Sequence, residues 1–199
     1  MSQISLYAIK PRFVARLDAI VVSCAAHGVG PNTVTLAAVP IAIAAGLVLV
    51  AGTRWPMVWV AIAPLMLLLM SVNAVDGALA RRTGRSTPRG AVINELVDRF
   101  DDLAVLIPGF VLAPAWTVTA AIVATLLAET VALVSWGAIG RRGLVGVMGK
   151  PDRAMTIAAG ALAAVALGPT PFFYAYLTIA VGSSIATVQR TAWVVRHAD

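Results

Sequence analysis

Two pairs of oxygen-bearing side chains stand at helical spacing in the middle of this chain of 199 residues. Asn73 and Asp76 are three residues apart and Asn94 and Asp98 are four apart, so each pair shares one face of a helix if its segment is helical. Both pairs adjoin long apolar stretches, where polar groups are costly and therefore indicate a functional site. Carboxylate and amide oxygens are ligands for hard cations such as Mg²⁺.

The segment between the two pairs is strongly basic. In ARRTGRSTPRG, residues 80–90, four arginines fall within nine residues. Guanidinium groups can hold phosphate through paired, charge-assisted hydrogen bonds, although a plain basic loop of a membrane protein has the same composition. Hard oxygen ligands beside guanidinium groups together favour a reaction at a phosphate that Mg²⁺ or Mn²⁺ assists.

The whole stretch NAVDGALARRTGRSTPRGAVINELVDR, residues 73–99, resembles the signature of the CDP-alcohol phosphotransferase family. That signature runs Asp-x2-Asp-Gly-x2-Ala-Arg-x8-Gly-x3-Asp-x3-Asp, and the spacing agrees at every step. Asn73 and Asn94 stand where the signature has its first and third aspartates. The likeness extends to KPRF at 10–13, GPNTVT at 30–35, GKPDRA at 149–154 and VQR at 188–190, and so covers nearly the whole chain.

The resemblance implies an enzyme of phospholipid biosynthesis. Such an enzyme transfers a substituted phosphate from a CDP-alcohol, often CDP-diacylglycerol, to the hydroxyl of a second alcohol and releases CMP. By the same resemblance Asp98 is the catalytic base, and one or two Mg²⁺ or Mn²⁺ ions are held by Asp76, Asn73 and Asn94. The CDP group would be held by Asp76, Gly77, Ala80, Arg81, Gly90 and Thr35, and the protein would be a homodimer.

The two asparagines leave two questions open. A neutral amide can ligate a hard cation but adds no charge, so a site of four carboxylates is reduced to two. Glu95, one residue from Asn94, points about 100° away on an ideal helix, so it does not replace the missing acid. The chain is therefore either an active branch of the family or a degenerate homologue that binds lipid or nucleotide without turnover.

A second basic set is expected beside the motif. The resemblance suggests that Arg141, Lys150, Arg153 and Arg190 bind an anionic acceptor such as a sugar or polyol phosphate, whereas orientation by anionic lipid is the alternative for the loop residues. Arg190 lies inside an apolar segment, where an arginine faces a polar cavity or a carboxylate. Glu129, also within an apolar run, either balances an arginine, lines the cavity, or is protonated or hydrogen-bonded for structural reasons.

The elements that position these residues are predicted to be membrane helices. Segment 10–27 is basic at its start and predicts an amphipathic helix on the membrane surface. Six apolar runs follow within 31–192, each near the 20 residues that a bilayer requires. Their approximate ranges are 32–51, 57–81, 90–110, 115–139, a run after the basic segment 141–153 that ends at 167, and 172–192.

The distribution of basic residues sets the topology. With six spans, fourteen of the fifteen lysines and arginines lie at one face, and only Arg54 lies at the other. The positive-inside rule then places both termini and the motif in the cytoplasm. The sequence therefore predicts an all-α integral membrane protein, 1–199 as one membrane domain, multi-pass in the cell membrane.

Composition excludes several other classes. Hydrophobic residues make up 60% of the chain and charged residues 12%, against about 25% charged in soluble domains. The net charge of +6 does not predict a nucleic-acid partner, because the basic residues lack the interleaved aromatic side chains of a single-strand binder. A transporter would be expected to show repeated halves, and the sequence shows none. Membrane lipids are the expected surroundings of the chain.

Overall fold

The computed structural model describes residues 10–198, in which all regular structure is helical. Two short helices come first, α1 (Lys10–Arg16) and α2 (Asp18–Ala26). The long helices are α3 (Pro31–Ala51), α4 (Ile62–Arg82), α5 (Pro88–Leu106), α6 (Ala115–Ile139), α7 (Lys150–Leu167) and α8 (Thr170–His197). A 3₁₀ segment, η2 (Pro56–Ala61), leads into α4, and another, η3 (Ile107–Val111), follows α5.

The opening segment differs from its prediction as a single helix over 10–27. The helix is interrupted at Leu17, whose N–H bonds to the carbonyl of Val14, three residues earlier, and α2 starts afresh at Asp18. Val21 of α2 packs with Val75 and Leu79 of α4. Helix α2 therefore packs against the end of α4 that carries the motif.

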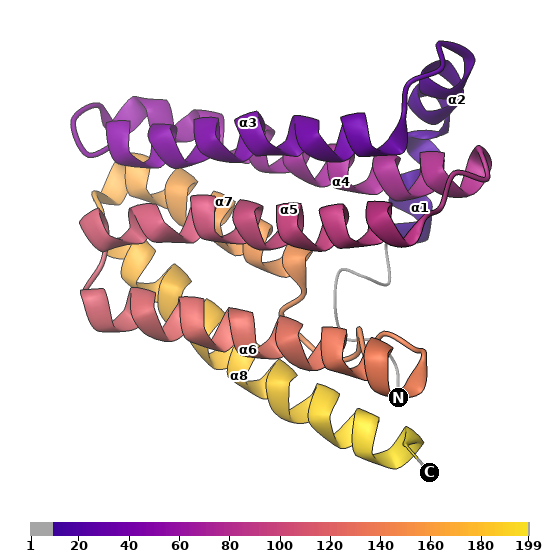
Figure 1. Ribbon diagram of the computed structural model, residues 1–199. Coiled ribbons are helices and arrows are strands. Elements are labelled where there is room, and N and C mark those ends of the chain that lie inside the picture. The colour runs from indigo at the N-terminus through magenta and orange to yellow at the C-terminus, as the bar shows by residue number, and fades with distance from the viewer. Residues whose placement is uncertain (1–9, 199) are drawn as a thin grey trace.

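The long helices form a bundle in which α3 lies along both α4 and α5, while α7 packs against α4 and α8, and α6 packs against α8 (Figure 1). Close approach of α3 to α5 depends on Gly46, where a Cβ atom would lie 2.5 Å from the carbonyl oxygen of Ala104. In Figure 1, α1 and α2, the α4–α5 turn and the C-terminus lie at one end of the molecule. The turn between α4 and α5, the two helices that carry the motif, therefore lies at the same end of the bundle as the C-terminal end of α8.

Side-chain sizes are distributed as expected for a protein in lipid. The interior of the bundle holds many alanines, such as Ala42, Ala121 and Ala161, which are fully buried. Large apolar side chains face outward, with Leu47 65% exposed and Leu127 52% exposed. Small residues allow membrane helices to pack closely, and a large outward apolar surface is stable only against lipid or another apolar partner.

Four helices are long and apolar enough to cross a membrane, namely Pro31–Ala51, Pro56–Arg82, Ala115–Ile139 and Thr170–His197. The prediction of six spans also counted α5 and α7, which lie within the bundle beside the other four (Figure 1). Both contain charged residues in numbers that lower their apolar character, including Glu95 to Asp102 in α5 and Lys150 to Arg153 in α7. The chain is a membrane protein, and its two less apolar long helices carry most of the charged residues of the bundle interior.

Candidate active site

An open pocket lies where the motif ends of α3, α4 and α5 meet. It encloses about 590 Å³, counting its open side. Seven of the residues singled out in the sequence line it together: Thr35, Asp76, Gly77, Ala80, Arg81, Gly90 and Asn94. These residues come from three helices, so the fold gathers the predicted CDP-binding set in one place.

The turn between α4 and α5 fixes the rim of this pocket. Gly84 takes a left-handed conformation, with φ of +64°, that reverses the chain after α4. Thr87 caps α5, because its Oγ1 accepts a hydrogen bond of 3.0 Å from the N–H of Gly90. A Cβ on Gly90 would lie 3.0 Å from Oδ1 of Asn32 at the start of α3. Gly90 thus lies against the N-terminal end of α3.

Asp76 is the buried acid of the pocket. Its side chain is oriented from α3, because Thr35 Oγ1 donates to Asp76 Oδ2 at 2.8 Å, while the N–H of Gly77 donates to Oδ1 at 2.5 Å. Asn94 lines the same pocket from α5. One carboxylate and one amide side chain thus line the same pocket.

This donor set decides which metal site fits. Among the described residues, no group of three or more His, Cys, Asp or Glu side chains could hold a metal ion. Mg²⁺ commonly binds through one or two carboxylates and completes its shell with water and substrate phosphate oxygens. Asp76 with Asn94 therefore fits a divalent ion that arrives with a diphosphate.

Asn73, the third predicted metal ligand, has a different neighbour. Its Nδ2 donates to Oδ2 of Asp101 on α5 at 3.1 Å. Asp101 is fully buried, and within residues 10–198 its Oδ1 has no hydrogen-bond donor. An amide at position 73 can donate to this carboxylate, whereas an aspartate there would repel it.

Asp98, the predicted base, is not among the residues that line the pocket but lies close to them. It lies one turn beyond Asn94 on α5, and its Oδ1 accepts a 2.6 Å bond from Nζ of Lys150, which also donates to Asp101 at 3.0 Å. The Asp98 side chain is 22% exposed, more than Asp101 or any other acid in the ion pairs around it. Of these acids it is the one that an incoming substrate can reach most easily.

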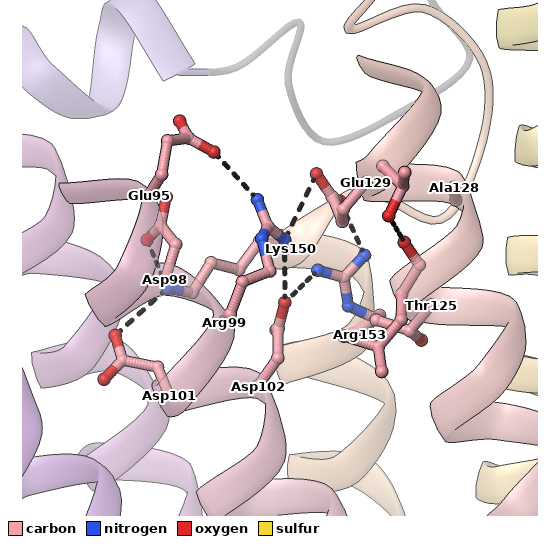
Figure 2. A network of polar contacts seen from close by, with 12 residues as sticks. Glu95, Asp98, Arg99, Asp101, Asp102, Thr125, Ala128, Glu129, Lys150 and Arg153 are labelled. Atoms are coloured by element: carbon pink, nitrogen blue, oxygen red, sulfur yellow. Dashed lines mark hydrogen bonds and ion pairs between the residues drawn. The ribbon is translucent and has the colours of Figure 1, made fainter. Parts of the chain in front are cut away.

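Behind Asp98, charged residues of α5 to α8 form an ion-pair network of two neighbouring groups, one around Lys150 and one around Glu129. Arg153 lies between two acids, with Nη2 2.8 Å from Asp102 and Nη1 3.1 Å from Glu129 (Figure 2). Glu129 Oε1 also lies 3.4 Å from Nη1 of Arg190. Of the alternatives left open by the sequence, the structure has Glu129 beside arginines and Arg190 facing a carboxylate.

The rim of the network contains two further arginines, Arg99 and Arg142. Arg99 contacts Glu95 at 3.1 Å, and Arg142 pairs with the same glutamate. The spacing Glu95–Arg99–Asp102 was a usable signal for helical ion pairs, but the partners on other helices were not readable. Of the four residues predicted to bind the acceptor, three belong to the network, whereas Arg141 is exposed in the α6–α7 connection.

Comparison with protein families agrees with the motif. A family model described as CDP-alcohol phosphatidyltransferase matches residues 29–195. The Inner membrane protein YnbA of Escherichia coli (strain K12) is 33% identical over 168 residues, which cover 83% of this chain and 82% of YnbA. Phosphatidylinositol phosphate synthase of Mycobacteroides abscessus is 31% identical over 172 residues, covering 82% of this chain and 76% of the relative.

Solved structures give the same fold. Mycobacterium tuberculosis phosphatidylinositol phosphate synthase (PgsA1) with CDP-DAG bound superposes with a TM-score of 0.71 at 25% identity, covering 88% of this chain and 92% of that one. The same protein in complex with manganese and citrate gives a TM-score of 0.71 at 24% identity, covering 89% and 88%.

Proposed function

The chain belongs to the CDP-alcohol phosphatidyltransferase family, and from this we propose that it transfers a substituted phosphate from a CDP-alcohol to the hydroxyl of an alcohol acceptor and releases CMP. The observation that carries the proposal is the pocket in which Thr35, Asp76, Gly77, Ala80, Arg81, Gly90 and Asn94 meet. These seven residues span 59 positions of the sequence, from Thr35 to Asn94, and they line one cavity at the end of a membrane bundle.

The donor is CDP-diacylglycerol in this proposal. A related protein has been solved with CDP-DAG bound, and the apolar outer face of the bundle suits the acyl chains. Arg81 and Arg85 line the pocket and supply guanidinium groups for the diphosphate. Gly77 and Ala80 leave room for the cytidine against the α4 backbone, and Gly90 keeps the opposite wall clear of side-chain atoms.

Asp98 is the proposed catalytic base. It takes the proton from the acceptor hydroxyl, the resulting oxygen forms a bond to the lipid-bearing phosphorus, and the bond from that phosphorus to the CMP oxygen breaks. Its electron pair leaves with CMP, and the proton on Asp98 passes to water. Lys150, bonded to Asp98 and Asp101, positions the Asp98 carboxylate for this step.

A divalent cation belongs to the proposal as well, since a relative is known in complex with manganese. Asp76 and Asn94 would hold one ion together with the donor's phosphate oxygens. When bound, the ion neutralises phosphate charge and polarises the phosphorus under attack. Asn73 would contribute only if its amide turned away from Asp101.

The proposed topology has six spanning helices with both termini and the pocket in the cytoplasm. Support comes from the basic residues at the pocket end and from the arrangement of α5 and α7 within the bundle (Figure 1). The ion pairs of these two helices with each other and with α6 would allow them to cross lipid despite their charges. The protein acts in the cell membrane, and the homodimer expected from the family resemblance is part of the proposal.

A second candidate function has one observation in its favour. The motif carries two amides, and the ammonium of Lys150 occupies the side of Asp98 nearest Asp101. A degenerate homologue would bind CDP-diacylglycerol in the same pocket without turnover. Such a protein would bind donor and release no CMP.

The test uses purified protein in lipid nanodiscs with CDP-diacylglycerol, Mn²⁺ or Mg²⁺ and a panel of alcohols, with CMP as the readout. The proposal predicts acceptor-dependent CMP release that the matched variant Asp98→Asn does not give. Donor binding without CMP release for every alcohol would favour the second candidate.

A further inference from the structure

The ion-pair network that adjoins Asp98 consists of two neighbouring groups. The pairs of Lys150 with Asp98 and Asp101 carry one net negative formal charge, and the second group, of three acids and four arginines, carries one net positive formal charge. The acids are Glu95, Asp98, Asp101, Asp102 and Glu129, and the bases are Arg99, Arg142, Lys150, Arg153 and Arg190. The formal charges of the two groups therefore cancel before any substrate enters.

The arginines deepest in this network contact carboxylates and backbone carbonyls of the protein itself. Arg190, 1% exposed, donates from Nη1 to the carbonyl of Ala128 at 2.7 Å and from Nε to that of Val145 at 3.3 Å, in addition to its contact with Glu129. Arg153 donates to Asp102, Glu129 and the carbonyl of Met148.

Glu129 stands where three guanidinium groups converge. Its carboxylate oxygens lie 3.1 Å from Arg153, 3.4 Å from Arg190 and 3.5 Å from Arg99. Figure 2 shows Arg99 and Arg153 both directed at Glu129 and Asp102. An internal carboxylate thus fills the position among the arginines that an anionic ligand would otherwise take.

An acceptor phosphate would have to displace this carboxylate. A phosphate monoester adds a charge of about −1.5 to −2 at neutral pH, and the displaced Glu129 would remain in the bundle without its partners. Uncompensated charge in a buried site costs several kcal/mol. The free cations of the site lie on the donor side instead, where Arg81 and Arg85 line the pocket and have no carboxylate partner among the described residues.

We propose that the acceptor of this protein is an uncharged alcohol, such as a sugar or polyol without phosphate or carboxylate. This inference rests on the proposed function, and it revises the expected acceptor-binding role of Arg153 and Arg190. These two arginines hold Glu129 and Asp102 and so keep α5 to α8 in register beside Asp98. The acceptor hydroxyl then meets Asp98 and Lys150 at the edge of a neutral network.

The test compares matched acceptors in nanodiscs with CDP-diacylglycerol and Mn²⁺: glycerol against glycerol 3-phosphate, and inositol against inositol 3-phosphate. At equal concentration, the uncharged member of at least one pair is expected to release at least ten times more CMP than its phosphorylated partner. Faster release with the phosphorylated members would overturn the inference and leave the proposed function intact. If neither class of acceptor gives CMP release, the proposed function is overturned, and the inference with it.

Removing the internal anion gives an independent arm. In Glu129→Gln the arginines gain a net positive charge, so the ratio of CMP release with phosphorylated to uncharged acceptor is expected to rise at least fivefold. Thr130→Ala, an exposed neighbour on α6 that bonds only the carbonyl of Leu126, is the control and leaves the ratio unchanged. Asp102→Asn repeats the experiment from α5 if Glu129→Gln is poorly folded, and an unchanged ratio in the folded variants contradicts the proposal.

Discussion

Arg190→Met tests whether the buried network is structural. Arg190 is 1% exposed and holds Glu129 at 3.4 Å together with two backbone carbonyls. Removing one partner of a buried ion pair costs about 3–5 kcal/mol, and the lower figure applies because Glu129 keeps Arg153 and Arg99. For a chain of this length, each kcal/mol lowers Tm by about 2–4 °C. The variant is therefore expected to unfold about 6–12 °C below the parent.

The matched control is Arg82→Met, which removes an arginine from the 3.2 Å pair with Asp18 at the surface. These side chains are 48% and 62% exposed, and such pairs contribute about 0–1 kcal/mol. Thermal unfolding in one detergent, followed by tryptophan fluorescence, gives both values. Equal shifts for the two variants would refute the reasoning, because burial would then have no bearing on the network's contribution.

Three further predictions concern the pocket. Asp98→Asn should lower CMP release by at least 100-fold with little change in Tm, and unchanged release would remove Asp98 from the role of base. The double change Asn73→Asp and Asn94→Asp should tighten Mn²⁺ binding measured by calorimetry, whereas no change in affinity would mean that these positions do not ligate metal. Thr35→Val removes the 2.8 Å hydrogen bond to Asp76, which is worth about 1 kcal/mol. KM for CDP-diacylglycerol should therefore rise about fivefold. An unaltered KM would show that this bond does not organise the donor pocket.

Much of the fold was readable from the sequence because its boundaries are marked locally. The helix predicted at 115–139 has those same bounds, since Pro114 precedes it and Gly140 ends it with a φ of +66°. The break at Leu17 was missed because no proline or glycine marks it. Lys150 and Arg153 were assigned to a loop, whereas they lie in the first turn of α7, where Pro151 suits the start of a helix.

The candidate site was predictable only in part, for a related reason. Motif spacing placed Asp76 and Asn94 near each other because each lies on one helix at a known position. The pairing of Asn73 with Asp101, and of Glu129 with three arginines, depends on how four helices face one another. One sequence gives the face of each helix but not its rotation against its neighbours, so the neutral network could not be derived from charge spacing alone.

The most direct test of the central claim is the identity of the lipid formed. Protein in nanodiscs is given CDP-diacylglycerol and an active acceptor from the panel, and CMP and lipid are quantified together by mass spectrometry. The account predicts one lipid per CMP, heavier than phosphatidic acid by the acceptor alcohol less one water, and neither species with Asp98→Asn. CMP accompanied only by phosphatidic acid, whatever alcohol is supplied, would indicate hydrolysis and contradict the account.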